Sequence, residues 1–480
     1  MRNQQLLLDI LSQPIAVLGL GISNLPLMTF LLEHGATDIT ARDMKPFDKL
    51  PPAVQALAER GVKFICGEHY MDNLCEQTVF RSPGVYPYVP ELMAVRARGG
   101  RVTSEMQLFF DLCPATVLGI TGSDGKTTTT TLVYELMRGE AERQGGAFEV
   151  YCGGNIGTPL LPQVDKMRST DFAVVELSSF QLQDMTYAPT HAVVTNVTKN
   201  HLNWHKDYDE YISAKKHIYE GSDGVTVLNA DNEVTLSMAK EVKAPRLFSS
   251  TRSYADLHSR YGDGTYIYLQ NGHMIYTSAD GHSEALLDIT EIRIPGRHNV
   301  ENYMAAAALT HDYIDNSVLR ALAPVFKGVR HRLEFVRKRG GVTYYNSSID
   351  SSPVRTRASL CALMERPIVI CGGAAKGLGF EALAETLVSR AKAVVLTGAT
   401  ADTIYEELLR NPLYDEENLP VLRRYDFREA VLTAADMAKS GDTVLLSPAC
   451  TSFDAFRNFE ERGDTFVSIV RGLPALDGDE

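Results

Sequence analysis

Residues 116–130 are TVLGITGSDGKTTTT, and this stretch determines the class of fold. An apolar, β-branched run of strand length is followed by a glycine turn, then by a lysine and a series of threonines. A strand, a glycine turn and a helix start open a βαβ unit and point backbone N–H groups at a phosphate. The stretch therefore predicts a phosphate-binding loop at the edge of a parallel sheet.

This loop supplies the first candidate binding residues. Lys126 is expected to meet the β- and γ-phosphates of a nucleotide, and Thr127 carries the hydroxyl that P-loop enzymes use on Mg²⁺. The strict G-x-x-x-x-G-K-[ST] pattern is not met, because position 120 is Ile. A chance glycine turn is the alternative, and the strand and helix on either side argue against it. The nucleotide-binding candidates are Gly122, Ser123, Asp124, Gly125, Lys126, Thr127 and Thr128.

A second apolar run, residues 172–176, ends in Glu176. A carboxylate at the end of a buried strand is a common oxygen ligand for Mg²⁺ in nucleotide enzymes. Alone it could equally be an ordinary strand-end acid, and the phosphate loop nearby favours the metal ligand. Asn196, His201 and Lys215 follow the next strand, and the pattern alone favours solvated positions for the histidine and the lysine.

Two more strands run into glycine turns, one before Gly19 and one before Gly372. The first turn starts like a dinucleotide fingerprint but has Asn24 at the third glycine position, so it indicates a phosphate-containing ligand without selecting one. Residues 253–294 have the alternation of antiparallel hairpins. We predict an α/β protein of three domains: Rossmann-like sheets at residues 1–113 and 328–480 flank a central P-loop ATPase domain, residues 114–327, with a small antiparallel insertion.

Composition excludes several classes of function. The chain has 480 residues, of which 44% are hydrophobic and 22% charged, as in soluble globular proteins. Its 47 basic and 60 acidic residues give a formal charge of -13, which disfavours nucleic acid and anionic membranes as partners. The seven cysteines form no CxxC pair, and we find neither a signal peptide nor an apolar run of about 18 residues. We therefore expect a cytoplasmic protein without membrane insertion.

Several longer runs carry a resemblance to a known family. They are GGNIG at residues 153–157, ELSSFQL at 176–182, NVT at 196–198 and SPACTSFD at 447–454. With the phosphate loop, and in this order, they resemble the Mur ligases, ATP-dependent amino-acid-adding enzymes of bacterial cell-wall synthesis, over nearly the whole chain. The resemblance implies an N-terminal domain for a UDP-substrate, a central ATPase and a C-terminal domain for the incoming amino acid.

The resemblance also implies roles for residues around the nucleotide. Thr127 and Glu176 would hold one Mg²⁺, and His201 with Lys215 a second. In the family this lysine is carbamylated, which turns a cation into a carboxylate-like oxygen ligand, because an ammonium could not bind Mg²⁺. The catalytic set would be Lys126, Glu176, His201 and Lys215. The further nucleotide contacts would be Asn299 and Asn302 at the adenine and Arg332 at the phosphates.

Two substrate sites are implied as well. Ser347 stands where the family commonly has an acidic residue, so Asp350 either takes over the polar role near the ATP phosphates or that contact is lost. Met44 replaces a residue that is often polar and is expected to pack rather than hydrogen-bond the uracil. The UDP-sugar would contact Gly19, Gly21, Ile22, Ser23, Asp43, Met44, Lys45, Ser82, Gly84 and Asn155. The amino acid, D-glutamate, would contact Ser351, Lys376, Ser452, Phe453 and Phe459, where a lysine and hydroxyls meet its carboxylates.

The activity implied by the resemblance is ligation of D-glutamate to UDP-N-acetylmuramoyl-L-alanine through an acyl phosphate, by an enzyme that uses ATP and two Mg²⁺ ions and acts as a monomer. One alternative is a sibling ligase that adds another amino acid, or related folylpolyglutamate-type chemistry. A second is a catalytically silent nucleotide-binding homologue, motivated by Ser347. A nicotinamide oxidoreductase is a third, and it leaves the phosphate loop unexplained.

Overall fold

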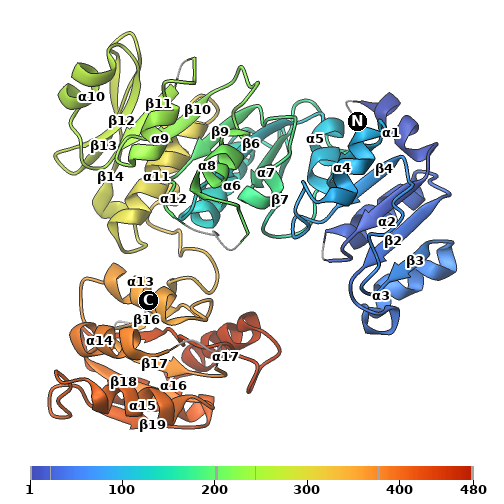
Figure 1. Cartoon of the computed structure of the whole chain (residues 1–480). Coiled ribbons are helices and arrows are strands. Elements are labelled where there is room, and N and C mark those ends of the chain that lie inside the picture. Colours follow the sequence, from blue (N-terminus) through green and yellow to red (C-terminus); the bar gives the residue numbers. More distant parts are fainter. Residues whose placement is uncertain (1–2, 22, 200–203, 244, 376–378, 477–480) are drawn as a thin grey trace. The chain divides into compact units, whose positions relative to one another are not determined.

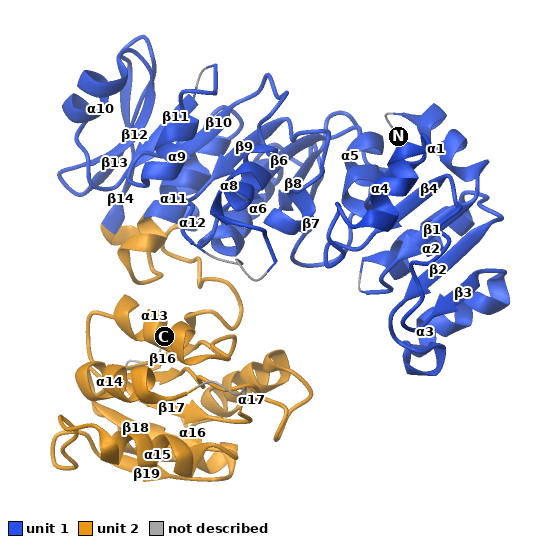
Figure 2. Cartoon of the chain, viewed as in Figure 1, with its two compact units in different colours: residues 1–289, 301–322 blue, residues 290–300, 323–480 orange. Residues whose placement is uncertain are grey.

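The computed structural model describes residues 3–21, 23–199, 204–243, 245–375 and 379–476. Within these residues the strands form three sheets against which helices pack (Figure 1). The chain divides into two compact units, residues 1–289 with 301–322 and residues 290–300 with 323–480 (Figure 2). The mixed α/β class and the three sheets confirm the fold class predicted from the sequence.

The N-terminal sheet is parallel, with the strand order β3-β2-β1-β4-β5. Every residue of β1 and β4 is buried, as expected for strands covered by helices on both faces. The strands are β1 (Ile15–Leu18), β2 (Ile39–Asp43), β3 (Lys63–Cys66), β4 (Thr78–Arg81) and β5 (Arg101–Thr103). The helices are α1 (Gln4–Leu11), α2 (Asn24–Glu33), α3 (Pro52–Gln55), α4 (Pro90–Ala97) and α5 (Glu105–Leu112), with 3-10 turns η1 (Phe47–Lys49) and η2 (Ala56–Arg60).

The central sheet has the order β14-β13-β12-β11-β10-β9-β6-β8-β7. The predicted hairpins are present, and they extend this sheet, because β12 pairs parallel to β11 while β13 and β14 are antiparallel. The strands are β6 (Thr116–Thr121), β7 (Val150–Gly154), β8 (Phe172–Glu176), β9 (His191–Val194), β10 (Thr226–Asn229), β11 (Pro245–Ser249), β12 (Thr265–Gln270), β13 (His273–Thr277) and β14 (Ser283–Asp288). The helices are α6 (Lys126–Arg143), α7 (Ser179–Leu182), α8 (Tyr208–Lys216), α9 (Glu233–Met238), α10 (Tyr254–Tyr261), α11 (Arg297–Thr310) and α12 (Asn316–Leu322), with 3-10 turns η3 (Leu161–Lys166) and η4 (Ile289–Glu291).

The N-terminal and central sheets share one hydrophobic core. One cluster of buried side chains extends through both sheets, and both α2 and α5 pack against η3 of the central domain. A separate cluster, which includes Ala16, Leu18 and Val79, covers the other face of the N-terminal sheet. This shared core explains why the two predicted domains fall into one compact unit. The predicted domain borders after residues 113 and 327 stay predictions.

The C-terminal sheet has the order β15-β16-β20-β17-β18-β19, with an antiparallel edge pair β15–β16 and parallel strands beyond it. Alternate residues of β17 belong to two hydrophobic clusters, so both faces of the sheet are covered. The strands are β15 (Glu334–Arg339), β16 (Val342–Asn346), β17 (Ile368–Gly372), β18 (Ala393–Thr397), β19 (Val421–Arg423) and β20 (Thr443–Leu446). The helices are α13 (Pro353–Ala362), α14 (Glu381–Arg390), α15 (Ala401–Arg410), α16 (Phe427–Met437) and α17 (Phe459–Arg471).

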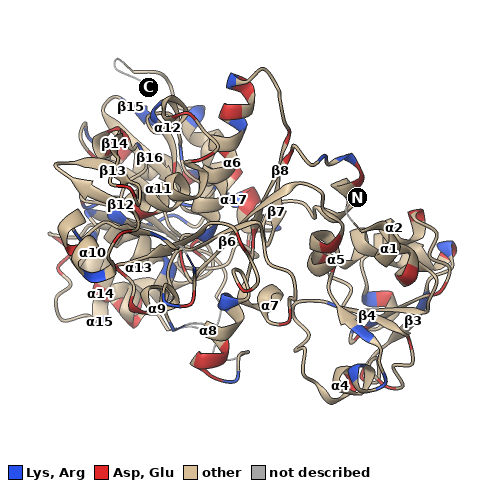
Figure 3. Ribbon diagram, turned by 90° about the horizontal axis from the view of Figure 1, so that it is seen from above, with Lys and Arg blue, Asp and Glu red and all other residues tan. Residues whose placement is uncertain are grey.

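The surface charges are mixed. Acidic and basic residues are interspersed along the described chain (Figure 3). In that part of the chain no helix is both long and apolar enough to cross a membrane. All seven cysteines are free thiols.

Candidate active site

The predicted phosphate loop connects β6 to α6. Gly122 has φ +152° and Gly125 has φ +79°, conformations that favour glycine. A Cβ on Gly122 would lie 1.9 Å from Thr195 Oγ1, and a Cβ on Gly125 would lie 2.3 Å from Asn302 Oδ1. Both positions therefore need glycine for space as well as for backbone conformation. The N-terminus of the long helix α6 follows directly and favours an anion at the loop.

Two lysines converge on the carbonyl oxygen of Gly122. Lys126 Nζ donates to this oxygen at 3.0 Å and to Ser123 O at 2.9 Å. Lys215 Nζ, from α8, donates to the same Gly122 oxygen at 2.7 Å and to Thr121 Oγ1 at 3.3 Å. Lys215 is 1% exposed, and burial, together with the charge of Lys126, lowers its pKa well below the ordinary lysine value. The site thus favours the neutral amine of Lys215.

Glu176 ends β8, directly beside β6 in the sheet, where it pairs with Ile120. Its Oε1 accepts a hydrogen bond from Asn155 Nδ2 at 3.0 Å. Its Oε2 is buried and has no hydrogen-bond partner among the described residues. A buried carboxylate oxygen without a partner costs about 1–3 kcal/mol, and a bound cation would remove that cost. The residues therefore fit Mg²⁺, which is usually held by one or two carboxylates together with substrate phosphates.

The second predicted metal ligand pair is only partly visible. Lys215 lies at the phosphate loop, whereas His201 lies outside the described residues. Within the described residues no three His, Cys, Asp or Glu side chains gather as a metal cluster. The role of Thr127, in the first turn of α6, stays a prediction.

The segment after β9 braces the phosphate loop. Asn196 Oδ1 accepts from the Asp124 N–H at 3.0 Å, and Thr195 Oγ1 donates to Asp124 O at 2.6 Å. The hydroxyls of Ser123 and Tyr211, the latter from α8, lie 2.9 Å apart. The segment after β9 and helix α8 therefore set the shape of the loop.

The predicted adenine ligands lie on α11. Asn302 is buried, and its Oδ1 accepts from Thr129 Oγ1 at 3.3 Å, beside the phosphate loop. Asn299 Nδ2 donates to Pro295 O at 2.6 Å. Asn302 belongs to the same compact unit as the loop, whereas Asn299 and Arg332 belong to the other unit. Their contacts with a nucleotide stay predictions.

Most of the described residues predicted to bind the UDP-sugar lie at the carboxyl ends of β1, β2 and β4, whereas Asn155 follows β7 and contacts Glu176. Gly19 has φ +76°, and a Cβ there would lie 2.9 Å from Ser82 Cβ. Asp43 accepts from the Leu20 N–H at 2.7 Å and from the Lys45 N–H at 2.9 Å, so its carboxylate shapes the turn.

Asn24, in place of the third glycine, closes the same turn through a 2.7 Å bond from its Nδ2 to Gly19 O. This amide explains why a third glycine is not needed. Met44 is 66% exposed, and Ile22 lies outside the described residues. The other predicted contacts at this edge are Gly21, Ser23 and Gly84.

Of the residues predicted to bind the amino acid, Ser452 and Phe453 lie in the loop after β20, Phe459 begins α17, and Ser351 follows β16. Ser452 is buried, Ser351 and Phe459 are half-buried, and Phe453 is 72% exposed. Lys376 lies outside the described residues.

Asp350 sits in a cage of hydroxyls in the same domain. Its Oδ2 accepts from Ser359 Oγ at 2.6 Å and from Ser447 Oγ at 2.8 Å. Burial raises the pKa of this carboxyl, and the serine hydrogen bonds, including one from Ser347, oppose that rise. The cage shows Asp350 in a structural role, and its contact with ATP stays a prediction. Ser347 also accepts from the Leu333 N–H at 3.2 Å, next to Arg332.

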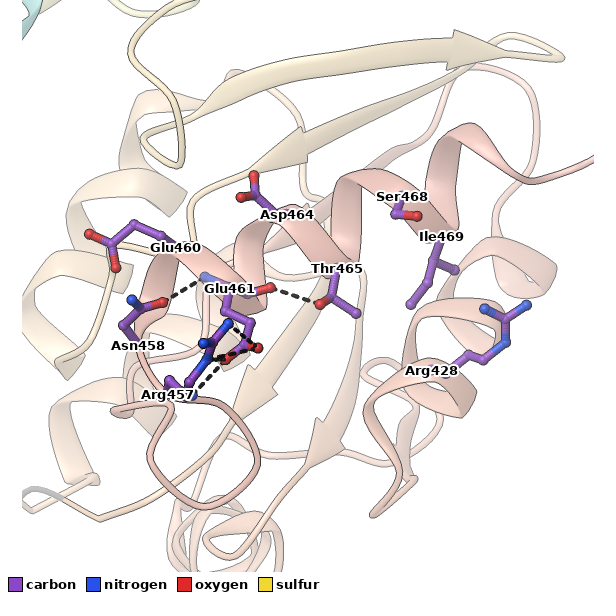
Figure 4. Close-up of a pocket in the computed structure, with 9 residues that line it drawn as sticks. All are labelled: Arg428, Arg457, Asn458, Glu460, Glu461, Asp464, Thr465, Ser468 and Ile469. Carbon is purple, nitrogen blue, oxygen red and sulfur yellow. Dashed lines mark hydrogen bonds and ion pairs between the residues drawn. The ribbon is translucent and has the colours of Figure 1, made fainter.

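A shallow groove of about 590 Å³ runs along α17 (Figure 4). Its lining includes Arg457 and Glu461, which pair with each other at 3.1 Å, Asp464 further along α17, and Arg428 from the neighbouring helix α16. None of the predicted site residues lines this groove. The groove therefore belongs to α16 and α17 rather than to the predicted site.

Comparison with known protein families gives three matches along the chain. Residues 13–104 match the Mur ligase MurD-like N-terminal domain, residues 120–310 the Mur ligase middle domain, and residues 331–450 the Mur ligase glutamate ligase domain. Over 471 residues the chain is 41% identical to the UDP-N-acetylmuramoylalanine--D-glutamate ligase of Ruminiclostridium cellulolyticum, covering 97% of this chain and 98% of that protein. The chain belongs to the Mur ligase family.

Further relatives agree with this assignment. The Acetivibrio thermocellus protein of the same name is 42% identical over 471 residues, which cover 97% of each chain. Among solved structures, the UDP-N-acetylmuramate-alanine ligase MurC of Thermotoga maritima matches with a TM-score of 0.55 and 18% identity, over 96% of this chain and 99% of that one. At that identity the match concerns the Mur ligase fold alone.

Several residues of this Mur ligase site had no signal in the sequence pattern. Arg462 is 2% exposed and donates to Cys450 O, to Thr451 O and, at 2.9 Å, to Ser348 O. It holds the loop that carries Ser452, and burial lowers its pKa to about 10. Tyr211 was missed for a similar reason, because only the fold brings it to the phosphate loop.

Proposed function

We propose that this Mur ligase catalyses the ATP-dependent addition of D-glutamate to UDP-N-acetylmuramoyl-L-alanine, a step in peptidoglycan precursor synthesis. One observation carries the proposal: Lys126 and Lys215 converge on the phosphate loop beside Glu176, whose second oxygen is buried without a hydrogen bond. That arrangement suits a triphosphate with a divalent cation. The names of the full-length relatives support D-glutamate as the amino acid.

The reaction proceeds in two steps. Lys126 and the N-terminus of α6 bind the β- and γ-phosphates, and a carboxylate oxygen of the alanyl group attacks the γ-phosphorus. ADP leaves, and an acyl phosphate remains. The amine of D-glutamate then attacks the acyl carbon, phosphate departs with the former carboxylate oxygen, and the nitrogen loses a proton as the amide forms. Protein groups act mainly by positioning and by stabilising charge.

Mg²⁺ is the cofactor of this proposal, at two positions. Thr127 and Glu176 would hold one ion, and His201 with a carbamylated Lys215 the other. When bound, the ions neutralise charge on the phosphates during transfer. The burial of Lys215, which lowers the pKa of its amine, supports carbamylation, because carbon dioxide reacts with an unprotonated amine. Asn299, Asn302 and Arg332 complete the nucleotide site in this proposal.

The substrates occupy the two flanking domains in this proposal. The turn after β1 and the Ser82 loop bind the UDP-sugar, and Ser452 and its neighbours bind D-glutamate. We also propose that the enzyme works as a monomer and that it acts in the cytoplasm. The seven free thiols support the second point, because cysteines stay reduced in that compartment.

A phosphate-release assay tests the proposed function. The protein receives ATP, Mg²⁺, UDP-N-acetylmuramoyl-L-alanine and one amino acid at a time, from D-glutamate, L-glutamate, L-alanine, L-lysine and meso-diaminopimelate. Release that requires D-glutamate supports the proposal. Release with a different amino acid identifies a sibling ligase, and no release with any of them identifies a silent homologue. Lys126→Ala should abolish turnover and leave binding of the UDP-substrate intact.

Carbamylation has a separate test. Activity should fall in buffer depleted of carbon dioxide and return when bicarbonate is added, and Lys215→Ala should be inactive in both buffers. Lys216 is a matched control because it lies next along α8, is partly exposed and pairs with Glu241 at 2.5 Å. Lys216→Ala should retain activity. Wild-type activity that does not depend on carbon dioxide would contradict carbamylation.

A further inference from the structure

The N-terminal and central sheets are joined by a set of side-chain contacts that the reaction as proposed does not use. We call the residues Arg81, Tyr86, Arg96, Asp184 and Glu210 the domain seam. Three of them belong to the N-terminal domain and two to the central domain, and all lie within one compact unit. Each makes a side-chain contact across the border between the two domains.

Arg81 is the centre of the domain seam. Its side chain is 0% exposed and forms an ion pair with Asp184, with a 3.0 Å hydrogen bond from Nε to the second carboxylate oxygen. The same guanidinium donates to Val85 O at 3.1 Å, within its own loop, and to Phe180 O at 3.1 Å, in α7. One planar group thus fixes the shape of the loop after β4 and its attachment to the central domain.

Asp184 and Glu210 complete the attachment. Arg96, from α4, makes a second ion pair with Asp184 at 3.2 Å. Tyr86 OH donates to Glu210 Oε1 at 2.5 Å, and burial, together with this hydrogen bond, raises the pKa of Tyr86 to about 12. Tyr86 is therefore a hydrogen-bond donor throughout the neutral pH range. The seam holds its loop at two separate points of the central domain.

Both attachment points lie close along the chain to predicted residues of the phosphate site. α7 follows Glu176 and is fixed by a capping box between Ser178 and Gln181. Glu210 belongs to α8, the helix that carries Lys215. On the other side, Ser82, the residue after Arg81, approaches the Gly19 turn. These contacts therefore connect the predicted UDP-sugar loop to α7, which follows Glu176, and to α8, which carries Lys215.

Trp204 packs beside the domain seam. Trp204, the only tryptophan of the sequence, lies 4.5 Å from Phe180 and 5.4 Å from Tyr86, measured between ring centroids. His205 follows it, is 2% exposed, and its Nε2 lies 2.9 Å from Ser179 Oγ. Trp204 contacts rings from both domains, so its fluorescence reports the integrity of the seam.

We propose that the domain seam is a positioning device that fixes the UDP-sugar loop relative to the phosphate loop, with Asp184 as its central positioning residue. The inference rests on the proposed function, because it concerns the alignment of the acceptor carboxylate with the γ-phosphate. Displacement of reacting groups by 1 Å can cost about 100-fold in rate. An ion pair with several directed hydrogen bonds provides such alignment, whereas apolar packing of equal strength does not.

Three variants separate alignment from stability. Asp184→Asn removes the charge that pairs with Arg81 and Arg96. The double variant Arg81→Met with Asp184→Leu replaces the pair by apolar groups, a change that is often neutral for stability. Asp165→Asn is the control, because Asp165 also joins the two domains, through a 3.1 Å contact with His34 Nε2, but at the end of α2 away from the Ser82 loop.

The measurements are kcat, KM for ATP and for the UDP-substrate, the thermal midpoint, and Trp204 emission. Asp184→Asn and the double variant should each lose at least tenfold in kcat, with KM for ATP within threefold of wild type and a red-shifted Trp204 emission. The double variant should melt no lower than Asp184→Asn. Asp165→Asn should keep kcat and emission unchanged. If Asp184→Asn does not fold, the double variant alone decides.

Two results overturn the proposal. One is a kcat within tenfold of wild type in a folded seam variant. The other is an equal loss in Asp165→Asn, which would show a general effect of weakened domain contact. If wild type releases no phosphate with D-glutamate, the proposed function fails first. Unchanged Trp204 emission in the seam variants would then overturn the seam proposal independently.

Discussion

Two buried glutamates of the central domain should respond in opposite ways to the same substitution. Glu176 and Glu140 are each 1% exposed. Glu140 is fully paired: it accepts from Arg143 at 2.7 Å and from the Asp315 N–H at 3.0 Å. Glu176 has one carboxylate oxygen without a hydrogen bond among the described residues. Glu176→Gln should therefore mainly lower kcat, whereas Glu140→Gln should mainly lower the free energy of unfolding.

The magnitudes follow from these contacts. In Glu176→Gln the amide oxygen can still accept from Asn155, and an unpartnered carboxylate oxygen is lost. The free energy of unfolding should change by no more than about 1 kcal/mol. An amide NH₂ cannot bind a cation, so kcat should fall at least about 100-fold, or about 2.7 kcal/mol of transition-state stabilisation.

Glu140→Gln should show the reverse. Its hydrogen bonds, above all those with Arg143, lower the pKa of Glu140 from 4.5 to about 2. Because the Arg143 side chain is 49% exposed, we discount the corresponding free energy to about 2 kcal/mol. Glu140→Gln should therefore destabilise the fold by about 2 kcal/mol and leave kcat within threefold of wild type.

Urea unfolding at pH 7 and D-glutamate-dependent phosphate release measure the two quantities on the same preparations. The reasoning is refuted if Glu176→Gln keeps a kcat within tenfold of wild type. It is also refuted if Glu176→Gln unfolds more easily than Glu140→Gln, because the carboxylate would then be structural.

Three further predictions follow from the structure. Gly125→Ala should raise KM for ATP at least tenfold, because Gly125 has φ +79° and a Cβ there would meet Asn302. Gly145→Ala is the matched control, since Gly145 has a similar φ of +69° and open space around it. Equal kinetics of the two variants would contradict the loop geometry. The contribution of Glu140 to the free energy of unfolding should be complete above pH 4.5 and be lost as pH falls towards 2, because the pKa of Glu140 is lowered in the folded state. Urea unfolding at a series of pH values should show the stabilities of wild type and Glu140→Gln converging in that window. Asp350→Ala should destabilise the C-terminal unit by about 2 kcal/mol, because Ser359 and Ser447 lose their hydrogen-bond acceptor. Asp350→Asn should recover much of this stability. An alanine variant with the thermal midpoint of wild type would show that the cage of hydroxyls is not required.

Local sequence patterns predicted much of the fold. The three strands that run into glycine turns are β1, β6 and β17, and each begins a parallel arrangement, because β-branched runs and glycine turns act over a few residues. The pairing of β12 with β11 was not predictable, since hairpin alternation in residues 253–294 does not reveal which strand receives the hairpin. The shared core of the first two sheets was also hidden, because it depends on contacts between distant segments.

Some residues of the candidate site were likewise predictable from local patterns, and others depend on the fold. Lys126 was predicted because it follows the glycine turn after a recognisable strand, and Glu176 because it ends one. Lys215 looked like a surface lysine from its pattern, and only the fold shows that it is buried beside the phosphate loop. Arg81 and Asp184 lie 103 residues apart, so no local pattern could pair them. Long-range burial and charge pairing are the parts of the site that one sequence does not reveal.

The central claim is that an acyl phosphate forms at the phosphate loop, and one isotope measurement tests it most directly. UDP-N-acetylmuramoyl-L-alanine labelled with ¹⁸O in its alanyl carboxylate is turned over with ATP, Mg²⁺ and D-glutamate, and the released phosphate is analysed by mass spectrometry. Transfer through an acyl phosphate predicts one carboxylate-derived oxygen in each phosphate released. Unlabelled phosphate, as plain ATP hydrolysis would produce, or label in AMP would contradict the mechanism.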